Sequence, residues 1–374
     1  MNTLTHVACP FPRHLDHSIS CMDFHKHMLV YSGRNSVVVV DTISMTHREF
    51  MFPSYVNSVK MLRHAQYLLV GASPSAYVMN LQDGHSLNLQ GHSESVVWTC
   101  EGKEWEVFTA SKDQSVKKWN RCNGNLLLTI NHDVFFDFVI YDAETDRIFI
   151  MDAKKVLHVW DATSGAKLLA VTYDHNYIHM VSSYQTICGV VSLENPGNIV
   201  VRDPITLEIK SKDKFQLGYF EFATMLPDGC HILLVRPNKI CIYNLLTGKA
   251  IASHQFRDAS GTHKISAVAV SSNGGHIACG RNNGELILLQ VDPPFAFPVL
   301  SIPKVRLADV ESSAVLLSDN TIIFNRTPVN CHDRDLRFQD ADDREKWRRG
   351  LYQVDGILQA MQSQYKNNFV INRY

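Results

Sequence analysis

Histidine and cysteine side chains that could bind a metal ion crowd the N-terminal segment. They are His14, His17, Cys21, His25 and His27. Zinc prefers imidazole and thiolate ligands, but a site needs them to converge with fixed geometry. In a strand, positions 25 and 27 share one face, and the pattern does not bring the other three to that face. We therefore interpret these residues as surface and core side chains, and we predict neither a metal site nor a cofactor.

The short motifs that mark common catalytic sites are missing from the sequence. It contains no GxSxG, no P-loop, no GxGxxG and no HExxH. Asp and Glu together number 37, but the sequence does not show which of these carboxylates meet. We predict that the protein is not an enzyme, with a site assembled from scattered loops as the alternative.

Charge and cysteine usage limit the classes of partner and the compartment. The chain carries 36 basic and 37 acidic residues, a net charge of −1, so we do not expect nucleic acid as a direct ligand. Nine cysteines without a CxxC pair are typical of reduced thiols. The start resembles no signal peptide, and no apolar run reaches the roughly 20 residues of a membrane helix. We expect a soluble cytoplasmic or nuclear protein that is neither secreted nor inserted in a membrane.

The elements that would position any site repeat along the chain. Eight short apolar runs end in a polar residue, at Asp41, Asn80, Asn120, Asp161, Asp203, Asn244, Gln290 and Asn325. The successive spacings are 39, 40, 41, 42, 41, 46 and 35 residues. A period near 40 with short strands indicates the blades of a propeller.

Each of these runs has apolar residues on both alternating faces, which predicts a strand covered on both sides by neighbouring sheets. One or two further strands precede each run, so a unit reads as four strands. Four units place a glycine four residues after the polar end, at Gly84, Gly124, Gly165 and Gly248. We predict hairpin turns in which these glycines adopt a positive φ.

The third unit, "GHSESVVWTCEGKEWEVFTASKDQSVKKWN", resembles a WD-repeat blade. Gly91 and His92 match the Gly-His of that family, Trp119 and Asn120 match its Trp-Asp, and Asp113 stands six residues before the tryptophan. The resemblance implies a structural hydrogen-bond chain from Trp119 to Thr109, from Thr109 to His92 and from His92 to Asp113. The fourth unit keeps "VWD" but lacks an aspartate six residues before Trp160, and the other units are more degenerate.

We therefore predict an all-β, WD-repeat-like β-propeller over residues 1–328, with eight blades and seven as the alternative. The last unit supplies three strands, and Pro328 argues against a regular fourth strand after them. The N-terminal "LTHVACP" is a spare strand that would complete the eighth blade and close the ring.

Residues 329–374 form a tail with a helical pattern. Its apolar positions step by three and four residues, at Trp347, Leu351, Val354, Leu358, Met361 and Tyr365. We expect this C-terminal α-helix to pack on the propeller, and a partner-binding stripe is the alternative. Arg348 and Arg349 resemble the paired arginines of phosphoinositide-binding propellers, but there the pair lies in a middle blade, so we favour a solvated helix face.

Lys118 is the one charged residue in a column of eight otherwise aliphatic residues. We expect its stem to lie along the blade and its ammonium to reach solvent or a carboxylate. On this interpretation, the Lys118→Val variant keeps or gains thermal stability.

A rigid ring that displays many variable loops suits the binding of other proteins. The resemblance implies a non-enzymatic WD-repeat scaffold within a multiprotein complex. A substrate receptor of a ubiquitin ligase is one alternative, although no F-box-like segment precedes the blades and neither Trp119 nor Trp160 is followed by Asp-x-Arg. An enzyme that uses the central channel of the ring is the other.

Overall fold

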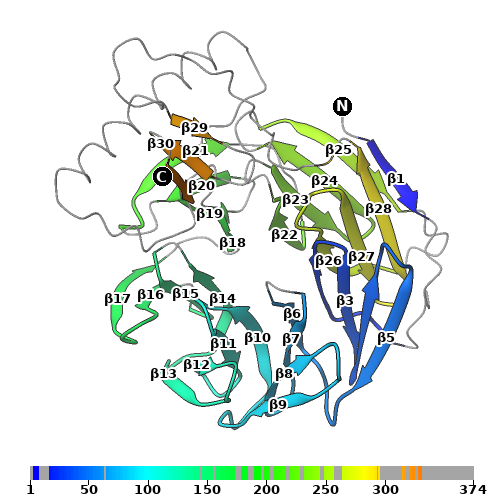
Figure 1. Cartoon of the computed structure of the whole chain (residues 1–374). Helices are drawn as coiled ribbons and strands as arrows, with labels where there is room; N and C mark the ends of the chain where they lie inside the picture. The colour runs from blue at the N-terminus through cyan, green and yellow to red at the C-terminus, as the bar shows by residue number, and fades with distance from the viewer. Residues whose placement is uncertain are drawn as a thin grey trace. The chain divides into compact units, whose positions relative to one another are not determined.

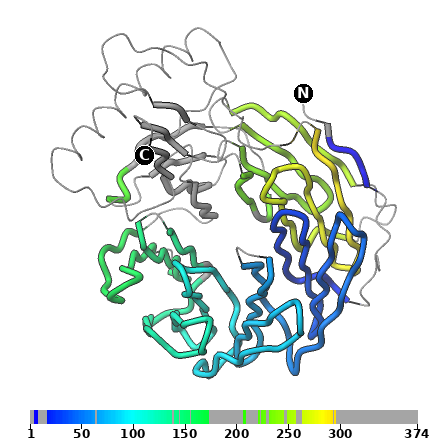
Figure 2. Tube along the Cα trace, viewed as in Figure 1, coloured from blue at the N-terminus to red at the C-terminus, as the bar shows by residue number. Residues whose placement is uncertain are grey.

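The fold was analysed in a computed structural model. It describes residues 3–7, 17–62, 65–143, 145–154, 156–172, 178–183, 189–194, 198–202, 206–214, 220–227, 231–244, 248–256, 263–292, 294, 314–316, 321–324 and 327–330, whose strands are drawn in colour in Figure 1. Figure 2 follows the same chain along its Cα trace. The predicted tail helix, with its six stripe residues and Arg348 and Arg349, lies outside the described residues. The chain divides into two units, Met1–Phe295 and Ala296–Tyr374. The boundary that we predict at residue 328 stays a prediction.

The first unit consists of antiparallel sheets of four strands each (Figure 1). The first sheet holds β2 (Cys21–His25), β3 (Met28–Gly33), β4 (Ser36–Asp41) and β5 (Thr46–Met51). The second holds β6 (Ser58–Met61), β7 (Tyr67–Gly71), β8 (Ala76–Asn80) and β9 (Ser86–Leu89). The third holds β10 (Val96–Glu101), β11 (Glu106–Ser111), β12 (Ser115–Asn120) and β13 (Leu126–Asn131). The fourth holds β14 (Phe136–Asp142), β15 (Arg147–Asp152), β16 (Val156–Asp161) and β17 (Lys167–Thr172).

The later sheets repeat this order. The fifth holds β18 (Ile178–Ser183), β19 (Gly189–Glu194), β20 (Asn198–Arg202) and β21 (Ile209–Lys214). The sixth holds β22 (Phe222–Met225), β23 (His231–Arg236), β24 (Lys239–Asn244) and β25 (Ala250–Gln255). The seventh holds β26 (Ile265–Val270), β27 (His276–Arg281), β28 (Leu286–Asp292) and the N-terminal strand β1 (Thr3–Val7). In the second unit, β29 (Ala314–Leu316), β30 (Thr321–Phe324) and β31 (Thr327–Asn330) form a three-stranded sheet.

Seven of the apolar runs of the repeat lie in the third strands of the four-stranded sheets, and the eighth lies in β30, the middle strand of the three-stranded sheet. For example, β4 ends at Asp41, β8 at Asn80, β12 at Asn120 and β16 at Asp161, as the repeat predicts. The four predicted turn glycines have φ values of 76°, 75°, 72° and 64°, which confirms the left-handed turns. The all-β fold class is confirmed.

The hydrophobic core lies between neighbouring sheets. One cluster joins the first and second sheets and includes Val39 and Leu68. Another joins the second and third sheets and includes Leu69 and Trp119. The second sheet contributes Met79 to the first of these clusters and Val78 to the other, so its third strand is apolar on both faces, as the sequence pattern predicts.

The closing strand differs from the prediction. Thr3 pairs with Asp292 and Val7 with Leu288, so β1 completes the seventh sheet rather than an eighth. The last unit instead gains β31, in which Pro328 pairs with Ile323. A proline removes one backbone donor, but an outer strand bonds on one side only, so an outer strand can contain it. The number of blades stays a prediction, and the pairing of β1 favours the alternative of seven.

Candidate functional site

The four polar side chains singled out in the third unit lie in one chain of hydrogen bonds. Trp119 Nε1 donates to Thr109 Oγ1 at 2.8 Å, and Thr109 Oγ1 lies 2.8 Å from His92 Nε2. His92 Nδ1 lies 2.8 Å from Asp113 Oδ2. The chain therefore links β11 and β12 to the turn between them and to the loop that enters β10.

Burial decides the protonation of this chain. It lowers the pKa of His92 below its ordinary value, and the hydrogen bond to Asp113 offsets only part of that effect. A neutral His92 then donates from Nδ1 to Asp113 and accepts at Nε2 from the Thr109 hydroxyl. Burial also acts to raise the pKa of Asp113, but hydrogen bonds from Ser115 and His92 outweigh it and hold that pKa below its ordinary value. Each polar group in the chain therefore has a partner of the opposite kind.

A close backbone approach explains the glycine beside His92. A Cβ built on Gly91 would lie 3.0 Å from Cη2 of Trp119. Any larger residue would push on a side chain that is fully buried. The Gly-His pair therefore leaves room for the indole that begins the hydrogen-bond chain.

Lys118 has a carboxylate partner in the structure. Its Nζ lies 3.0 Å from Glu106 Oε1, on the neighbouring strand β11, and the two side chains are 8% and 27% exposed. The ammonium also lies 5.8 Å from the centre of the Phe108 ring. The lysine stem thus lies along the sheet as expected. The pairing of its ammonium with the partly buried carboxylate of Glu106 argues against the prediction that Lys118→Val keeps or gains thermal stability.

Replacing Lys118 is expected to destabilise the protein modestly. Lys118→Met keeps the apolar stem but leaves Glu106 unpaired, so we expect a loss of about 1 kcal/mol in the free energy of unfolding. A double-mutant cycle with Glu106→Gln, followed by urea unfolding, measures the coupling between the two side chains. A coupling indistinguishable from zero would show that the pair adds nothing and that the original expectation stands.

The histidine-rich N-terminal segment keeps its structural interpretation where the structure describes it. Cys21 Sγ lies 2.8 Å from the Ser32 hydroxyl, and burial raises the pKa of the thiol to about 11, so it is not a thiolate. His14 lies outside the described residues. Within the described part of the chain, three possible metal ligands converge elsewhere, at His132, Asp152 and His158. The sequence analysis does not single out these three residues.

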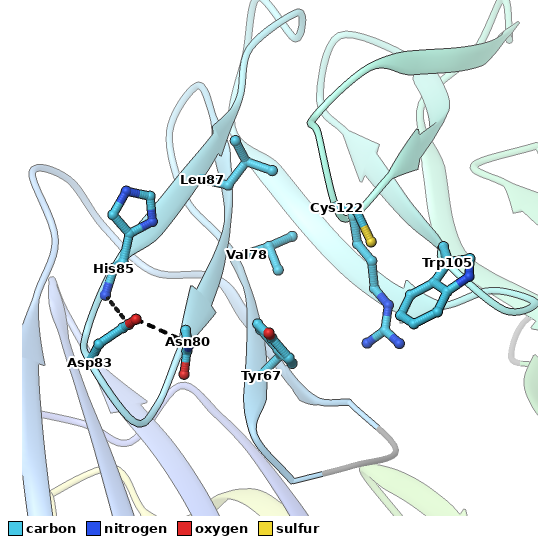
Figure 3. A pocket seen from close by; sticks show the side chains of 9 residues that line it. Tyr67, Val78, Asn80, Asp83, His85, Leu87, Trp105 and Cys122 are labelled. Carbon is cyan, nitrogen blue, oxygen red and sulfur yellow. Dashed lines mark hydrogen bonds between the residues drawn. The ribbon is translucent and has the colours of Figure 1, made fainter.

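A pocket of about 330 Å³ opens between the second and third sheets (Figure 3). It lies at the sheet edge where the first and second strands, and the third and fourth strands, are joined. Its lining residues are Tyr67, Val78, Asn80, Asp83, His85, Leu87, Trp105, Arg121 and Cys122. In Figure 3 the indole of Trp105 and the ring of Tyr67 stand on opposite sides of the pocket. We call this the inter-sheet pocket.

Arg121 gives the inter-sheet pocket its chemistry. The residue is only 7% exposed, and its guanidinium carbon lies 5.0 Å from the Trp105 ring centre and 5.9 Å from that of Tyr67. Its nearest carboxylate oxygen, on Glu101, is 4.0 Å away, too far for a hydrogen bond. Among the described residues the guanidinium has no hydrogen-bond acceptor, and its Nε is fully buried. The pocket therefore presents unused charged donors between two aromatic walls.

Turns hold these lining residues in place. The backbone N–H of Arg121 donates to the Trp105 carbonyl at 2.8 Å, which ties together the two turns of the third sheet. In the second sheet, Asp83 accepts from the His85 backbone at 2.8 Å and from Asn80 Nδ2 at 3.3 Å, as the dashed lines of Figure 3 mark. The walls are thus set by backbone contacts before any ligand arrives.

No sequence pattern predicts the inter-sheet pocket. Arg121 and Trp105 lie outside the aligned apolar runs. The units share no residue pattern in those segments, so neither residue stands out as a departure from the repeat. The available signal is Trp105 itself, a tryptophan in the otherwise charged stretch "GKEWE". It is 56% exposed in the structure, and an exposed tryptophan is uncommon.

Repeated four-stranded sheets, an N-terminal strand in the last of them, and one Trp-Thr-His-Asp chain define a WD40-like β-propeller. Among solved structures, the chain is similar to the crystal structure of the WD40 beta propeller domain of Doa1, with a TM-score of 0.63. The sequence identity is 17%, over 78% of this chain and 97% of that one. No family model and no curated protein matches the chain. At this identity the likeness shows the fold.

Within the part of the chain that the structure describes, no helix has the length and apolar character that a bilayer span requires.

Proposed function

We propose that the protein is a non-enzymatic scaffold that binds other proteins, and that the inter-sheet pocket is a place where a partner docks. The observation that carries the proposal is the guanidinium of Arg121, which lies between exposed aromatic walls, has only a 4.0 Å ion pair with Glu101, and makes no hydrogen bond to another described residue. Trp105 is 56% and Tyr67 37% exposed, so a ligand would cover apolar surface that now faces water. Tryptophan, tyrosine and arginine are the residue types enriched at the energetic centres of protein interfaces.

The chemistry of the pocket indicates which part of a partner it would hold. A guanidinium offers paired N–H donors that match a carboxylate. The flanking rings and Leu87 favour an apolar group beside that carboxylate. We infer that the pocket takes a short peptide segment in which an acidic side chain or a C-terminal carboxylate stands next to an apolar residue.

Variants of the pocket are expected to lose partner proteins without losing the fold. Trp105→Ala and Arg121→Gln each remove one half of the inferred contact, and a central interface residue contributes about 2 kcal/mol, or roughly thirtyfold in affinity. Phe135→Ala is the matched control, because Phe135 is 59% exposed and does not line the pocket. Affinity purification with quantitative mass spectrometry identifies proteins that the two pocket variants lose and the control keeps.

A second measurement tests the ligand chemistry directly. Peptides from a protein lost by both pocket variants are titrated in matched pairs, with Asp or Glu replaced by Asn or Gln. We expect the acidic member to bind the wild-type protein at least tenfold more tightly, and the two members to bind Arg121→Gln equally. If both pocket variants keep every partner of the wild-type protein, the pocket is not a docking site. If partners are lost but the acidic and amide peptides bind alike, the scaffold proposal stands and the carboxylate assignment fails.

A further inference from the structure

Three side chains that could bind a metal meet at one end of the fourth sheet. His132 follows β13, Asp152 ends β15, and His158 lies within β16. One ligand atom from each lies within 4.8 Å of the others, and the three residues are 8%, 2% and 7% exposed. The His132 and His158 rings stand 4.5 Å apart at an angle of 79°. We call this group the fourth-sheet cluster.

The fourth-sheet cluster occupies the place of the hydrogen-bond chain in the third sheet. The fourth sheet keeps the tryptophan, Trp160, and a histidine ring, His132, 6.3 Å from it, much as His92 stands 6.2 Å from Trp119. Ile150, which is opposite His158, replaces Thr109, which is opposite Lys117. The hydroxyl that links tryptophan to histidine is therefore lost, and Trp160 Nε1 is buried without a hydrogen-bond partner among the described residues.

Backbone contacts already fix two of the three possible ligands. His132 Nδ1 lies 3.0 Å from the Val134 carbonyl oxygen and 3.3 Å from the Val134 backbone nitrogen, so Val134 occupies Nδ1 and Nε2 is the ring nitrogen left for a ligand. A histidine that binds a metal commonly uses its other ring nitrogen in this way. Asp152 Oδ1 accepts from the backbone N–H groups of Lys154 and Val156, both at 2.9 Å. These bonds hold the carboxylate so that Oδ2 faces His158.

His158 is held more loosely. Its Nε2 lies 2.9 Å from Asp152 Oδ2, and its Nδ1 is buried without a hydrogen-bond partner in the described part of the chain. The ligand atoms of a tetrahedral zinc ion stand about 3.3 Å apart. A small rotation of a ring held by one side-chain hydrogen bond therefore opens the space for an ion between Nε2 and Oδ2.

We propose that His132, Asp152 and His158 bind one Zn²⁺ ion, with water as the fourth ligand. Two imidazoles and one carboxylate suit zinc better than magnesium or calcium, which take oxygen ligands. The small exposed fraction of each histidine admits the water. The ion would link the loop before β14, the end of β15 and the middle of β16, as the hydrogen-bond chain links the corresponding segments of the third sheet. This proposal replaces the sequence-based expectation of no metal site.

The test uses the full chain after treatment with a chelator. Titration with ZnCl2, followed by calorimetry and by metal analysis after dialysis, is expected to give one tight equivalent. His158→Gln and Asp152→Asn keep the local hydrogen bonding and are expected to weaken Zn²⁺ binding by about 100-fold or more. His47→Gln, at an exposed position on β5 and outside the inter-sheet pocket, is the matched control. His27→Gln tests the N-terminal histidines as a competing site, and both are expected to bind Zn²⁺ as the wild type does.

A spectroscopic measurement keeps the proposal testable if a cluster variant does not fold. Co²⁺ added to the wild-type chain is expected to produce the intense visible absorption of a four-coordinate site, and Zn²⁺ is expected to displace it. Zn²⁺ should also raise the melting temperature of the wild type and of both control variants. Absence of a tight equivalent in the wild type, or its loss in His27→Gln and survival in His158→Gln, would show that hydrogen bonds alone hold the cluster.

Discussion

Replacing Trp119 with alanine is expected to lower the free energy of unfolding by about 3–5 kcal/mol. Trp119 is among the largest fully buried side chains and packs against apolar residues of both the second and the third sheet. The variant would leave a cavity between two sheets and remove the first donor of the hydrogen-bond chain. Urea unfolding followed by far-ultraviolet circular dichroism measures the change without depending on indole fluorescence.

Two further variants separate packing from hydrogen bonding. Trp105→Ala removes the same side chain at a position 56% exposed, and we expect a change within about 0.5 kcal/mol. Thr109→Val keeps the shape of the side chain but leaves Trp119 Nε1 and His92 Nε2 without their shared partner, at a cost of about 1–3 kcal/mol. If Thr109→Val were as stable as the wild type, the hydrogen-bond chain would contribute nothing beyond the packing of the indole.

Introducing charge at the two apolar positions of β1, one on each face of the strand, is expected to have a comparably large effect. Leu4 packs against the apolar cluster shared by the sixth and seventh sheets, and Val7 against the cluster shared by the seventh and first. Leu4→Asp combined with Val7→Asp would place two unpaired carboxylates against these clusters and expose the edge of β28. We expect the free energy of unfolding to fall by about 4 kcal/mol, measured by thermal and urea unfolding.

The outer positions of the same strand provide a control of equal charge. Thr5 and His6 are exposed, so Thr5→Asp combined with His6→Asp should change stability by less than about 1 kcal/mol. Light scattering of both double variants would show whether the uncovered edge promotes association. Equal stability of the two double variants would mean that β1 does not complete the seventh sheet in solution.

The repeat could be predicted because each unit must form a sheet whose third strand buries apolar side chains on both faces. The third strands of the first four sheets end where the apolar runs end, and Gly84, Gly124, Gly165 and Gly248 take the positive φ that their turns require. The residues of the third-sheet hydrogen-bond chain could be named because Trp119, Thr109, His92 and Asp113 keep their family spacing. These features depend on contacts within a single sheet, which a sequence read along one repeat can show.

Features that join different units could not be predicted in this way. The N-terminal strand could complete either the seventh or the eighth sheet, and Pro328 led us to predict the eighth. The observed pairing of β1 depends on the edge of β28. The inter-sheet pocket is built from turns of two sheets, where Arg121 lies between Trp105 of its own sheet and Tyr67 of the neighbouring one. His158 lies in a strand that follows the repeat pattern. It becomes a possible ligand only because the pairing of β15 with β16 and the loop after β13 bring Asp152 and His132 close to it.

The pairing of Thr3 with Asp292 has a consequence for biosynthesis. The partner of the first strand is among the last elements of the unit to leave the ribosome, so β1 waits unpaired while the intervening sheets are translated. A contact between positions so distant in sequence forms slowly, because a long loop must close first. During that interval the edge of the seventh sheet, and the apolar residues of β1, would be the surfaces on which a chaperone is most needed. Completion of the seventh sheet thus waits until β28 has been translated.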